Sequence, residues 1–195
     1  GAIRCDYQVT AVNALGSFPI LLAGTEEQKR KYLPGIARGE KLAAFGLSEK
    51  GAGSDAGGLS CQGRPDGDHY VLNGAKKWNT NGPAADLNTV FAVTDPDSKS
   101  RRVSAFLLER GMPGFEAGKR LKKMGLKGQD TAELFFDNVE VPAENLLGQE
   151  NNGFIYLMQE LPWERMQIAI GAIAKAEAAI EWTKTYVTER KVFGK

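Results

Sequence analysis

The hydrophobic pattern of this chain changes from a helical repeat to the two-residue repeat of β-strands between about residues 42 and 141, and becomes helical again afterwards. Val90 to Thr94 and Val103 to Leu108 are apolar runs separated by a polar segment, and Leu134 to Val141 is a further run that ends at Pro142. Because the segments between these runs carry no helical pattern, antiparallel connections are expected rather than parallel crossovers. The region is therefore predicted to form a small antiparallel β-barrel or sandwich.

A hairpin is predicted in the first half of this region. Tyr70 to Leu72 and Ala75 to Trp78 flank the dipeptide Asn73-Gly74. Asn-Gly tolerates the positive φ angles of a type I′ turn, which is the common two-residue hairpin turn. The sequence therefore predicts two strands joined at Asn73-Gly74.

Residues 1–40 carry helical patterning, and two short helices are expected there. Thr25-Glu26-Glu27-Gln28 has the spacing of a capping box, which predicts a helix start at this point. Pro34-Gly35 predicts the end of the same helix after Leu33.

The last segment predicts a longer helix that needs packing partners. Its start is expected near Leu161, because Pro162 then lies in the first turn, where its missing N–H costs nothing. Glu164 would also lie in that first turn. A mostly apolar stripe follows one helix face: Met166, Ala169, Ile173, Ala176, Ile180, Thr183 and Val187. The fold class is therefore α+β, with a helical N-terminal segment, a central β domain and a C-terminal helix whose apolar stripe needs packing partners.

The charge and cysteine content exclude several classes of function. The 25 basic and 24 acidic residues leave a net charge of +1, which gives no electrostatic case for nucleic acid or a charged membrane surface. No apolar run reaches the roughly 20 residues of a membrane span, and no signal peptide is visible. Cys5 and Cys61 are isolated, so a reducing compartment and no metal site are expected. His69, the only histidine, is interpreted as a solvated turn residue.

The segment from Phe45 to Asp55, F-G-L-S-E-K-G-A-G-S-D, is predicted to be part of a binding site. An apolar strand there breaks into a turn with glycines, hydroxyls and carboxylates, which brings bare backbone close to a polar ligand. Residues 51–56 also match the glycine pattern of a dinucleotide-binding turn, but the segment that follows is too rich in glycine to open a helix. A glycine loop with a purely structural use remains the alternative.

Several motifs follow one another in a specific order: Gly24-Thr25-Glu26-Glu27-Gln28-Lys29, the Ser48 to Asp55 loop, Asn73-Gly74, Trp78-Asn79-Thr80-Asn81-Gly82, Lys123-Met124-Gly125, Val139-Glu140-Val141-Pro142 and Arg190-Lys191-Val192-Phe193-Gly194-Lys195. In this order they resemble the central part of the acyl-CoA dehydrogenase family, flavin enzymes that desaturate acyl thioesters. The resemblance implies the end of an N-terminal helical domain at residues 1–40, a middle β domain at 41–150 and the start of a C-terminal helical bundle at 151–195.

The resemblance implies FAD as the cofactor. In the family, the stretch matching Phe45 to Ser54 lines the flavin and the acyl-CoA channel, and the stretch matching Trp78-Asn79-Thr80 forms a second wall. Hydroxyl donors and an aromatic surface suit the edge and face of a flavin ring. The residues implied at the cofactor are Phe45, Leu47, Ser48, Ser54, Trp78, Asn79, Thr80, Arg190 and Phe193.

Two of these residues have other interpretations. Arg190 and Phe193 resemble positions that reach FAD across a subunit interface, where an arginine suits the charge of the phosphates. Without the motif, a surface salt bridge for Arg190 and a core position for Phe193 would be preferred.

The reaction implied by the resemblance needs a base that removes the proton α to the thioester, and Glu164 is the predicted base. The segment 158–165 resembles the long-chain type, which implies Pro162, Trp163, Glu164 and Arg165 at the substrate, and the match of the Phe45 to Ser54 stretch implies Ser54 there too. Burial would raise the pKa of a carboxylate toward neutrality, as a base requires. The alternative is a glutamate that only stabilises a helix N-terminus, where the helix dipole lowers its pKa. Glu160 is one turn away, but Pro162 is expected to break the register.

The chain also departs from the family pattern at four positions. Lys50 replaces a proline, Asn79 an apolar residue, Val192 a residue that often bears a hydroxyl, and Ile155 a tyrosine of the long-chain type. Asn79 is expected either to add a hydrogen bond near the flavin or to face solvent. Because Ile155 replaces a substrate-contacting residue, chain-length specificity is not inherited from the resemblance.

The resemblance implies α,β-dehydrogenation of acyl-CoA thioesters to 2-enoyl-CoA, with electron-transferring flavoprotein as acceptor and a homotetrameric assembly. It also implies a bacterial cytoplasm or a mitochondrial matrix as the compartment. An acyl-CoA oxidase-like relative and a non-catalytic assembly module are the alternatives. Retention of FAD separates the enzyme from the module, and oxygen reactivity separates the dehydrogenase from the oxidase.

Overall fold

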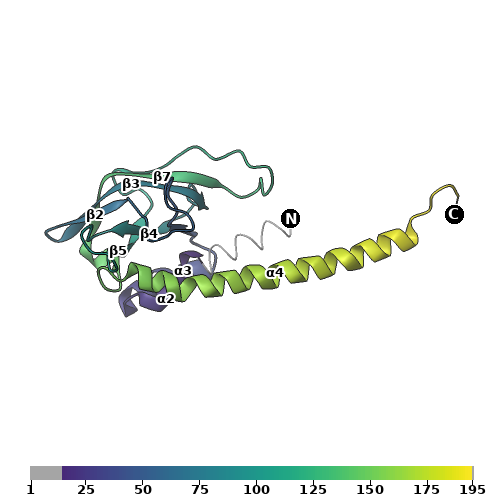
Figure 1. Ribbon diagram of the computed structural model, residues 1–195, viewed down its shortest axis with the longest axis horizontal. Coiled ribbons are helices and arrows are strands. Elements are labelled where there is room, and N and C mark those ends of the chain that lie inside the picture. The colour runs from purple at the N-terminus through teal and green to yellow at the C-terminus, as the bar shows by residue number, and fades with distance from the viewer. Residues whose placement is uncertain (1–14, 195) are drawn as a thin grey trace. The chain divides into compact units, whose positions relative to one another are not determined.

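The computed structural model describes residues 15–194, which belong to two compact units that divide between Glu160 and Leu161. In chain order the elements are α2 (Phe18–Ala23), α3 (Glu26–Ala37), β1 (Ala43–Gly46), β2 (Gln62–Asp66), β3 (His69–Thr80), β4 (Leu87–Val93), β5 (Val103–Glu109), β6 (Phe115–Ala117), β7 (Thr131–Pro142), the short 3-10 helix η2 (Ala143–Asn145), β8 (Leu146–Leu147) and α4 (Gly153–Glu189) (Figure 1). Cys5 lies outside the described residues. The α+β class is confirmed.

The predicted capping box begins α3. The Thr25 hydroxyl accepts a hydrogen bond from the Gln28 N–H at 3.1 Å, and the Gln28 side chain accepts one from the Thr25 N–H at 3.0 Å. The Gln28 amide then donates to the carbonyls of Glu144 and Leu146, which ties the helix to the segment after β7. The predicted end after Leu33 is wrong, because Pro34 lies inside α3 and the helix continues to Ala37. The two helices expected in this part of the chain are both present.

The eight strands form one sheet with the order β6-β7-β3-β2-β4-β5-β8, and β1 pairs with β4 off this path. Most pairs are antiparallel, including the predicted β4–β5 pair, in which Val90 lies opposite Phe106. The pairs of β4 with β1 and with β2 are parallel, so the sheet is mixed rather than purely antiparallel. The parallel β1–β4 pair matters for the site, because it fixes the strand from which the Phe45 to Asp55 loop leaves the sheet.

The predicted hairpin at Asn73-Gly74 is wrong. β3 runs without a turn from His69 to Thr80, and Gly74 lies at a shift in its register with β7. Gly74 has φ 142°, and a Cβ atom there would lie 2.9 Å from the Cα atom of Cys61. Glycine is therefore required for close backbone approach at a β-bulge, and not for a turn. The real hairpin joins β2 to β3 through Gly67-Asp68, where Gly67 has φ 64°.

Two hydrophobic clusters lie on opposite faces of the central strands. All seven residues of β4 are buried, and alternate residues join different clusters. Phe91 belongs to the cluster that includes Ile20 of α2 and Leu157 of α4. Val90 belongs to the other cluster, which includes Phe106 of β5 and Leu134 of β7. Burial on both faces makes β4 the centre of the first unit.

The long helix α4 begins at Gly153, so the predicted start near Leu161 is wrong. Its first two turns belong to the first unit, where Gly153, Leu157 and Glu160 are buried. A Cβ atom on Gly153 would lie 2.9 Å from the carbonyl carbon of Ser104, so the helix start rests directly on the backbone of β5. Pro162 lies inside a helix that continues through it, and the break expected there does not occur.

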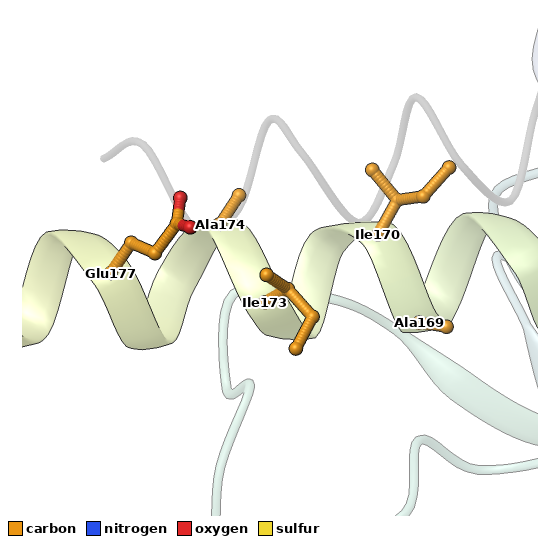
Figure 2. A pocket seen from close by; sticks show the side chains of 5 residues that line it. All are labelled: Ala169, Ile170, Ile173, Ala174 and Glu177. Atoms are coloured by element: carbon orange, nitrogen blue, oxygen red, sulfur yellow. The ribbon is translucent and has the colours of Figure 1, made fainter.

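The second unit presents the predicted apolar stripe of α4 as an exposed surface. Met166, Ile173 and Ile180 all retain more than half of their accessible area. A hollow of about 400 Å³ lies on this helix, lined by Ala169, Ile170, Ile173, Ala174 and Glu177 (Figure 2). Among residues 15–194, no helix combines the length and apolar character needed to cross a membrane.

Candidate functional site

The loop that follows β1 is a folded turn held by its own backbone. The Glu49 N–H donates to the Ala52 carbonyl at 2.8 Å, and the Ala52 N–H donates back to the Glu49 carbonyl at 3.3 Å. Residues 56–61 contain no helix, and the chain passes from them into β2. A dinucleotide-binding turn needs a helix N-terminus at this point, so that interpretation is excluded for this loop.

The side chain of Glu49 organises both ends of the loop. One carboxylate oxygen accepts hydrogen bonds from the N–H and the hydroxyl of Ser60, at 2.7 and 2.6 Å. The other oxygen accepts from the Cys61 N–H at 3.1 Å and from the Lys76 ammonium at 2.6 Å. A buried carboxylate with this many donors is held firmly in its ionised form.

Lys76 is the buried partner of Glu49, and its side chain is completely enclosed. Besides Glu49, its ammonium group donates to the Leu47 carbonyl at 3.2 Å. Burial lowers the pKa of Lys76, against the opposing effect of Glu49. Burial would raise the pKa of Glu49, but the hydrogen bonds from Lys76 and Ser60 outweigh it and lower that pKa. The neighbouring Cys61 thiol has its pKa raised to about 11 by burial, so it is inert at neutral pH.

Trp78 occupies a second irregularity in β3, between Lys76 and Asn79. Its φ angle is 63°, an unfavourable conformation for a bulky side chain, and 61% of its surface is exposed. Strained backbone of this kind persists only where the surrounding structure enforces it, and it is concentrated at functional sites. The bulge directs a large aromatic surface away from the core.

The loop and the strand meet at what we call the loop–strand junction, residues 47–49 and 76–78. The Lys77 N–H donates to the Ser48 carbonyl at 2.7 Å, which fixes Ser48 beside the residue that precedes Trp78. The structure therefore brings together Leu47, Ser48 and Trp78, three residues predicted at the cofactor. Ser48 is half-buried and carries a hydroxyl, and Trp78 presents an exposed indole one residue after Lys77. A hydroxyl donor and an aromatic surface are the groups that suit a flavin ring.

The remaining predicted residues of the first unit lie around this junction. Phe45 packs on Phe91 with ring centroids 5.1 Å apart, and Thr80 is half-buried at the end of β3. Ser54 is exposed on the loop. Asn79 is buried and its side-chain amide donates to the Ala132 carbonyl at 3.3 Å, so the expectation that it faces solvent is wrong.

Glu164 and its neighbours lie about three turns into α4, so Glu164 is not in the first turn of a helix. The alternative interpretation of Glu164 as a residue that stabilises a helix N-terminus therefore does not apply. Pro162 and Trp163 line an apolar hollow of about 270 Å³ together with Met166. Glu164 is half-buried, and Arg165 is exposed.

Glu160 lies one helical turn before Glu164 on the same face of α4, because the helix is continuous. It is fully buried in the first unit. The expected break at Pro162, which set Glu160 apart from Glu164, is absent. Both carboxylates therefore need to be compared in any test of the base.

Arg190 and Phe193 follow the end of α4 in the second unit. The Arg190 guanidinium lies 5.4 Å from the centre of the Tyr186 ring and donates to the Tyr186 hydroxyl. Phe193 is fully exposed and has φ 52°, so a core position for it is not seen in the described residues. Among these residues, no cluster of three or more histidine, cysteine or acidic side chains is arranged to hold a metal ion.

Sequence models of three acyl-CoA dehydrogenase domains match the chain: the N-terminal domain over residues 2–40, the middle domain over 44–139 and the C-terminal domain over 151–195. The chain belongs to the acyl-CoA dehydrogenase family. The resemblance inferred from the ordered motifs is thereby confirmed.

Individual relatives agree with this assignment. The mitochondrial long-chain specific acyl-CoA dehydrogenase of Mus musculus is 49% identical over 174 residues, which are 88% of this chain and 40% of that protein. Among solved structures, an acyl-CoA dehydrogenase from Geobacillus kaustophilus superposes with a TM-score of 0.92 at 46% identity, over 97% of this chain and 50% of that one. An acyl-CoA dehydrogenase complexed with FAD from Bacillus anthracis superposes with a TM-score of 0.90 at 41% identity, over 96% of this chain and 32% of that one. The chain thus spans at most about half the length of these acyl-CoA dehydrogenases.

Sequence reasoning missed Glu49 and Lys76, which hold the loop–strand junction together. A signal for Lys76 was present, because the two-residue repeat of β3 places it on the same face as the buried Tyr70 and Leu72. A lysine at an apolar position of a strand indicates a buried partner. Its pairing with Glu49, distant in the sequence, follows only from the fold.

Proposed function

We propose that the complete protein containing this chain is an FAD-dependent acyl-CoA dehydrogenase that converts acyl-CoA thioesters to 2-enoyl-CoA. Family membership supports the class of reaction, and the Bacillus anthracis relative was solved with FAD. The observation that carries the proposal is Trp78, which is exposed at a positive φ angle and directly follows Lys77, whose N–H binds the Ser48 carbonyl.

The residues present fit a flavin. Trp78 offers an aromatic face, the Ser48 and Thr80 hydroxyls offer donors at a ring edge, and Phe45 and Leu47 supply apolar packing beside them. When bound, FAD would supply the acceptor for the hydride that leaves the substrate's β carbon. Arg190 and Phe193 are proposed to contact FAD bound by another subunit of a homotetramer, where the guanidinium would pair with phosphate oxygens.

Glu164 is the proposed base. Its carboxylate takes the proton from the carbon α to the thioester, which leaves the β carbon ready for oxidation. A carboxylate gains basicity when burial disfavours its charge, and Glu164 is already half-buried on α4. Ser54 and Arg165 are the proposed polar contacts of the acyl-CoA. Electron-transferring flavoprotein is the proposed acceptor that reoxidises the enzyme.

Anaerobic flavin reduction tests this proposal. The complete protein should purify with a flavin absorption spectrum, and a panel of straight and branched acyl-CoA thioesters should bleach it. Slow reoxidation by oxygen would favour a dehydrogenase, and fast reoxidation an oxidase. A protein that retains no added FAD would contradict the proposal and favour an assembly module.

A further inference from the structure

The loop–strand junction depends on an ion pair with no direct place in the proposed chemistry. Three consecutive loop residues are tied to two consecutive residues of β3. The Leu47 carbonyl and the Glu49 carboxylate bind the Lys76 ammonium, and the Ser48 carbonyl binds the Lys77 N–H. Trp78 follows immediately. Every one of these bonds therefore lies within one or two residues of a proposed flavin contact.

The fold leaves little freedom for Lys76 and Gly46. A Cβ atom on Gly46 would lie 3.5 Å from Cγ of Lys76 and 3.3 Å from a Val90 methyl group. The end of β1 thus passes directly over the lysine stem, which reaches Glu49 with a side chain that has no exposed surface. Two buried polar side chains and the backbone between them form one enclosed network.

A buried ion pair contributes little net stability to a fold, because the desolvation penalty of two charges offsets most of their electrostatic attraction. Well-packed apolar residues of similar volume often stabilise a protein equally well or better. A buried pair held by several hydrogen bonds instead fixes geometry, since few arrangements satisfy both members. Because Glu49 and Lys76 lie at the loop–strand junction, the geometry that they fix is that of the neighbouring Ser48 and Trp78.

We propose that Glu49 and Lys76 are positioning residues of the flavin site, which hold Ser48 and Trp78 in their binding arrangement before the cofactor arrives. The inference rests on the proposed function. Glu49 also closes the far end of the loop through Ser60 and Cys61, so the single carboxylate fixes the loop at both ends. Loss of the pair frees the Leu47 carbonyl and loosens the loop, while Ser48 and Trp78 remain chemically intact.

The test compares the complete wild-type protein with Lys76→Met and with the double variant Glu49→Gln/Lys76→Met. Methionine approximates the lysine stem but cannot donate, and glutamine keeps the shape of the glutamate. Lys31→Met is the matched control, because Lys31 forms an ion pair of 2.7 Å with Glu109 on the same unit, away from the junction. The readouts are the FAD dissociation constant of the apoprotein, the shape of the bound flavin's absorption spectrum, and kcat and KM for an acyl-CoA.

We expect both junction variants to bind FAD more weakly and to show an altered flavin spectrum. Displacement of a positioning group by about 1 Å costs about 10²-fold in rate, so kcat should fall by that order while KM changes much less. The control should match the wild type in all four quantities. The double variant leaves no unpaired buried charge, so it keeps the comparison valid even if Lys76→Met fails to fold.

Two outcomes would overturn the proposal. One is a folded double variant with wild-type FAD affinity, spectrum and kcat. The other is an equal loss in Lys31→Met, which would reduce the effect to general stability. A wild-type protein that binds no FAD would instead remove the proposed function itself, and it would do so before any variant is compared.

Discussion

Replacing Gly153 by alanine is expected to destabilise the protein, although the same change inside a helix is usually stabilising. A Cβ atom at this position would lie 2.9 Å from the Ser104 carbonyl carbon and 3.0 Å from the Val103 carbonyl oxygen. Both are backbone atoms of the central sheet, so neither can move cheaply. Overpacking of this kind lowers the free energy of unfolding by about 1–3 kcal/mol. The higher helix propensity of alanine raises it by at most about 1 kcal/mol. A contact below 3.0 Å with a backbone atom places the cost of overpacking at the upper end of its range, about 2–3 kcal/mol, so the net loss should be about 1–2 kcal/mol.

Gly35→Ala in α3 is the matched control for this change. The new Cβ atom would meet only the Lys41 side chain, at 3.4 Å, which is flexible enough to move aside. Chemical denaturation of the complete protein should therefore show a gain of about 0.5–1 kcal/mol for Gly35→Ala, set by propensity alone. If Gly153→Ala is as stable as Gly35→Ala, α4 does not begin on the backbone of β5, and the account of this helix is wrong.

Three further predictions concern the cap, the base and the buried carboxylate. Thr25→Ala removes the hydrogen bond to the Gln28 N–H and should cost about 1 kcal/mol in unfolding free energy, whereas Thr25→Ser should retain most of it. Glu164→Gln should leave FAD bound and slow flavin bleaching by an acyl-CoA about 10²–10⁴-fold. Bleaching should persist in the control variant Glu160→Gln. Near-normal bleaching in Glu164→Gln would rule out Glu164 as the base. Burial would raise the pKa of Glu49, but the hydrogen bonds from Lys76 and Ser60 outweigh it and lower this pKa below its usual 4.5. The Glu49 carboxylate therefore stabilises the folded state fully above pH 4.5. This stabilisation is lost as the pH falls through the lowered pKa of the folded state. Glu49→Gln should flatten that acid limb in unfolding titrations, and an unchanged limb would contradict the assignment.

Local signals predicted the parts of the fold whose causes are local. The capping box at Thr25 and the β4–β5 pair both follow from residues close together in the sequence, and both are present. The family could likewise be recognised, because its motifs lie in a fixed order along the chain. Sequence patterns were therefore sufficient for the class of fold and for the loop that carries Ser48.

The errors arose where tertiary contacts override a local preference. Asn73-Gly74 has the composition of a turn, but Gly74 is needed because Cys61 presses against its backbone. Pro162 favours a helix start, but α4 continues through this residue, because the first two turns of α4 are already packed on the first unit at Gly153 and Leu157. Proline inside a helix loses one hydrogen bond and strains the preceding turn, a cost that burial of an earlier turn can offset.

The site was only partly accessible from the sequence for the same reason. Ser48 and Trp78 could be named from motifs, but the contact between their segments is a backbone hydrogen bond that no pattern reveals. The φ angle of Trp78 and the pairing of Glu49 with Lys76 also depend on long-range structure. These features support the interpretation of the loop as a pre-shaped site rather than a flexible one.

A crystal structure of the complete protein with FAD and a non-oxidisable acyl-CoA analogue tests the central claim most directly. The flavin ring is expected against Trp78, with the Ser48 hydroxyl at its edge. A Glu164 carboxylate oxygen is expected about 3–3.5 Å from the carbon α to the thioester, as proton abstraction requires. A flavin bound away from the loop–strand junction, or an α carbon that faces Glu160 instead of Glu164, would contradict this claim.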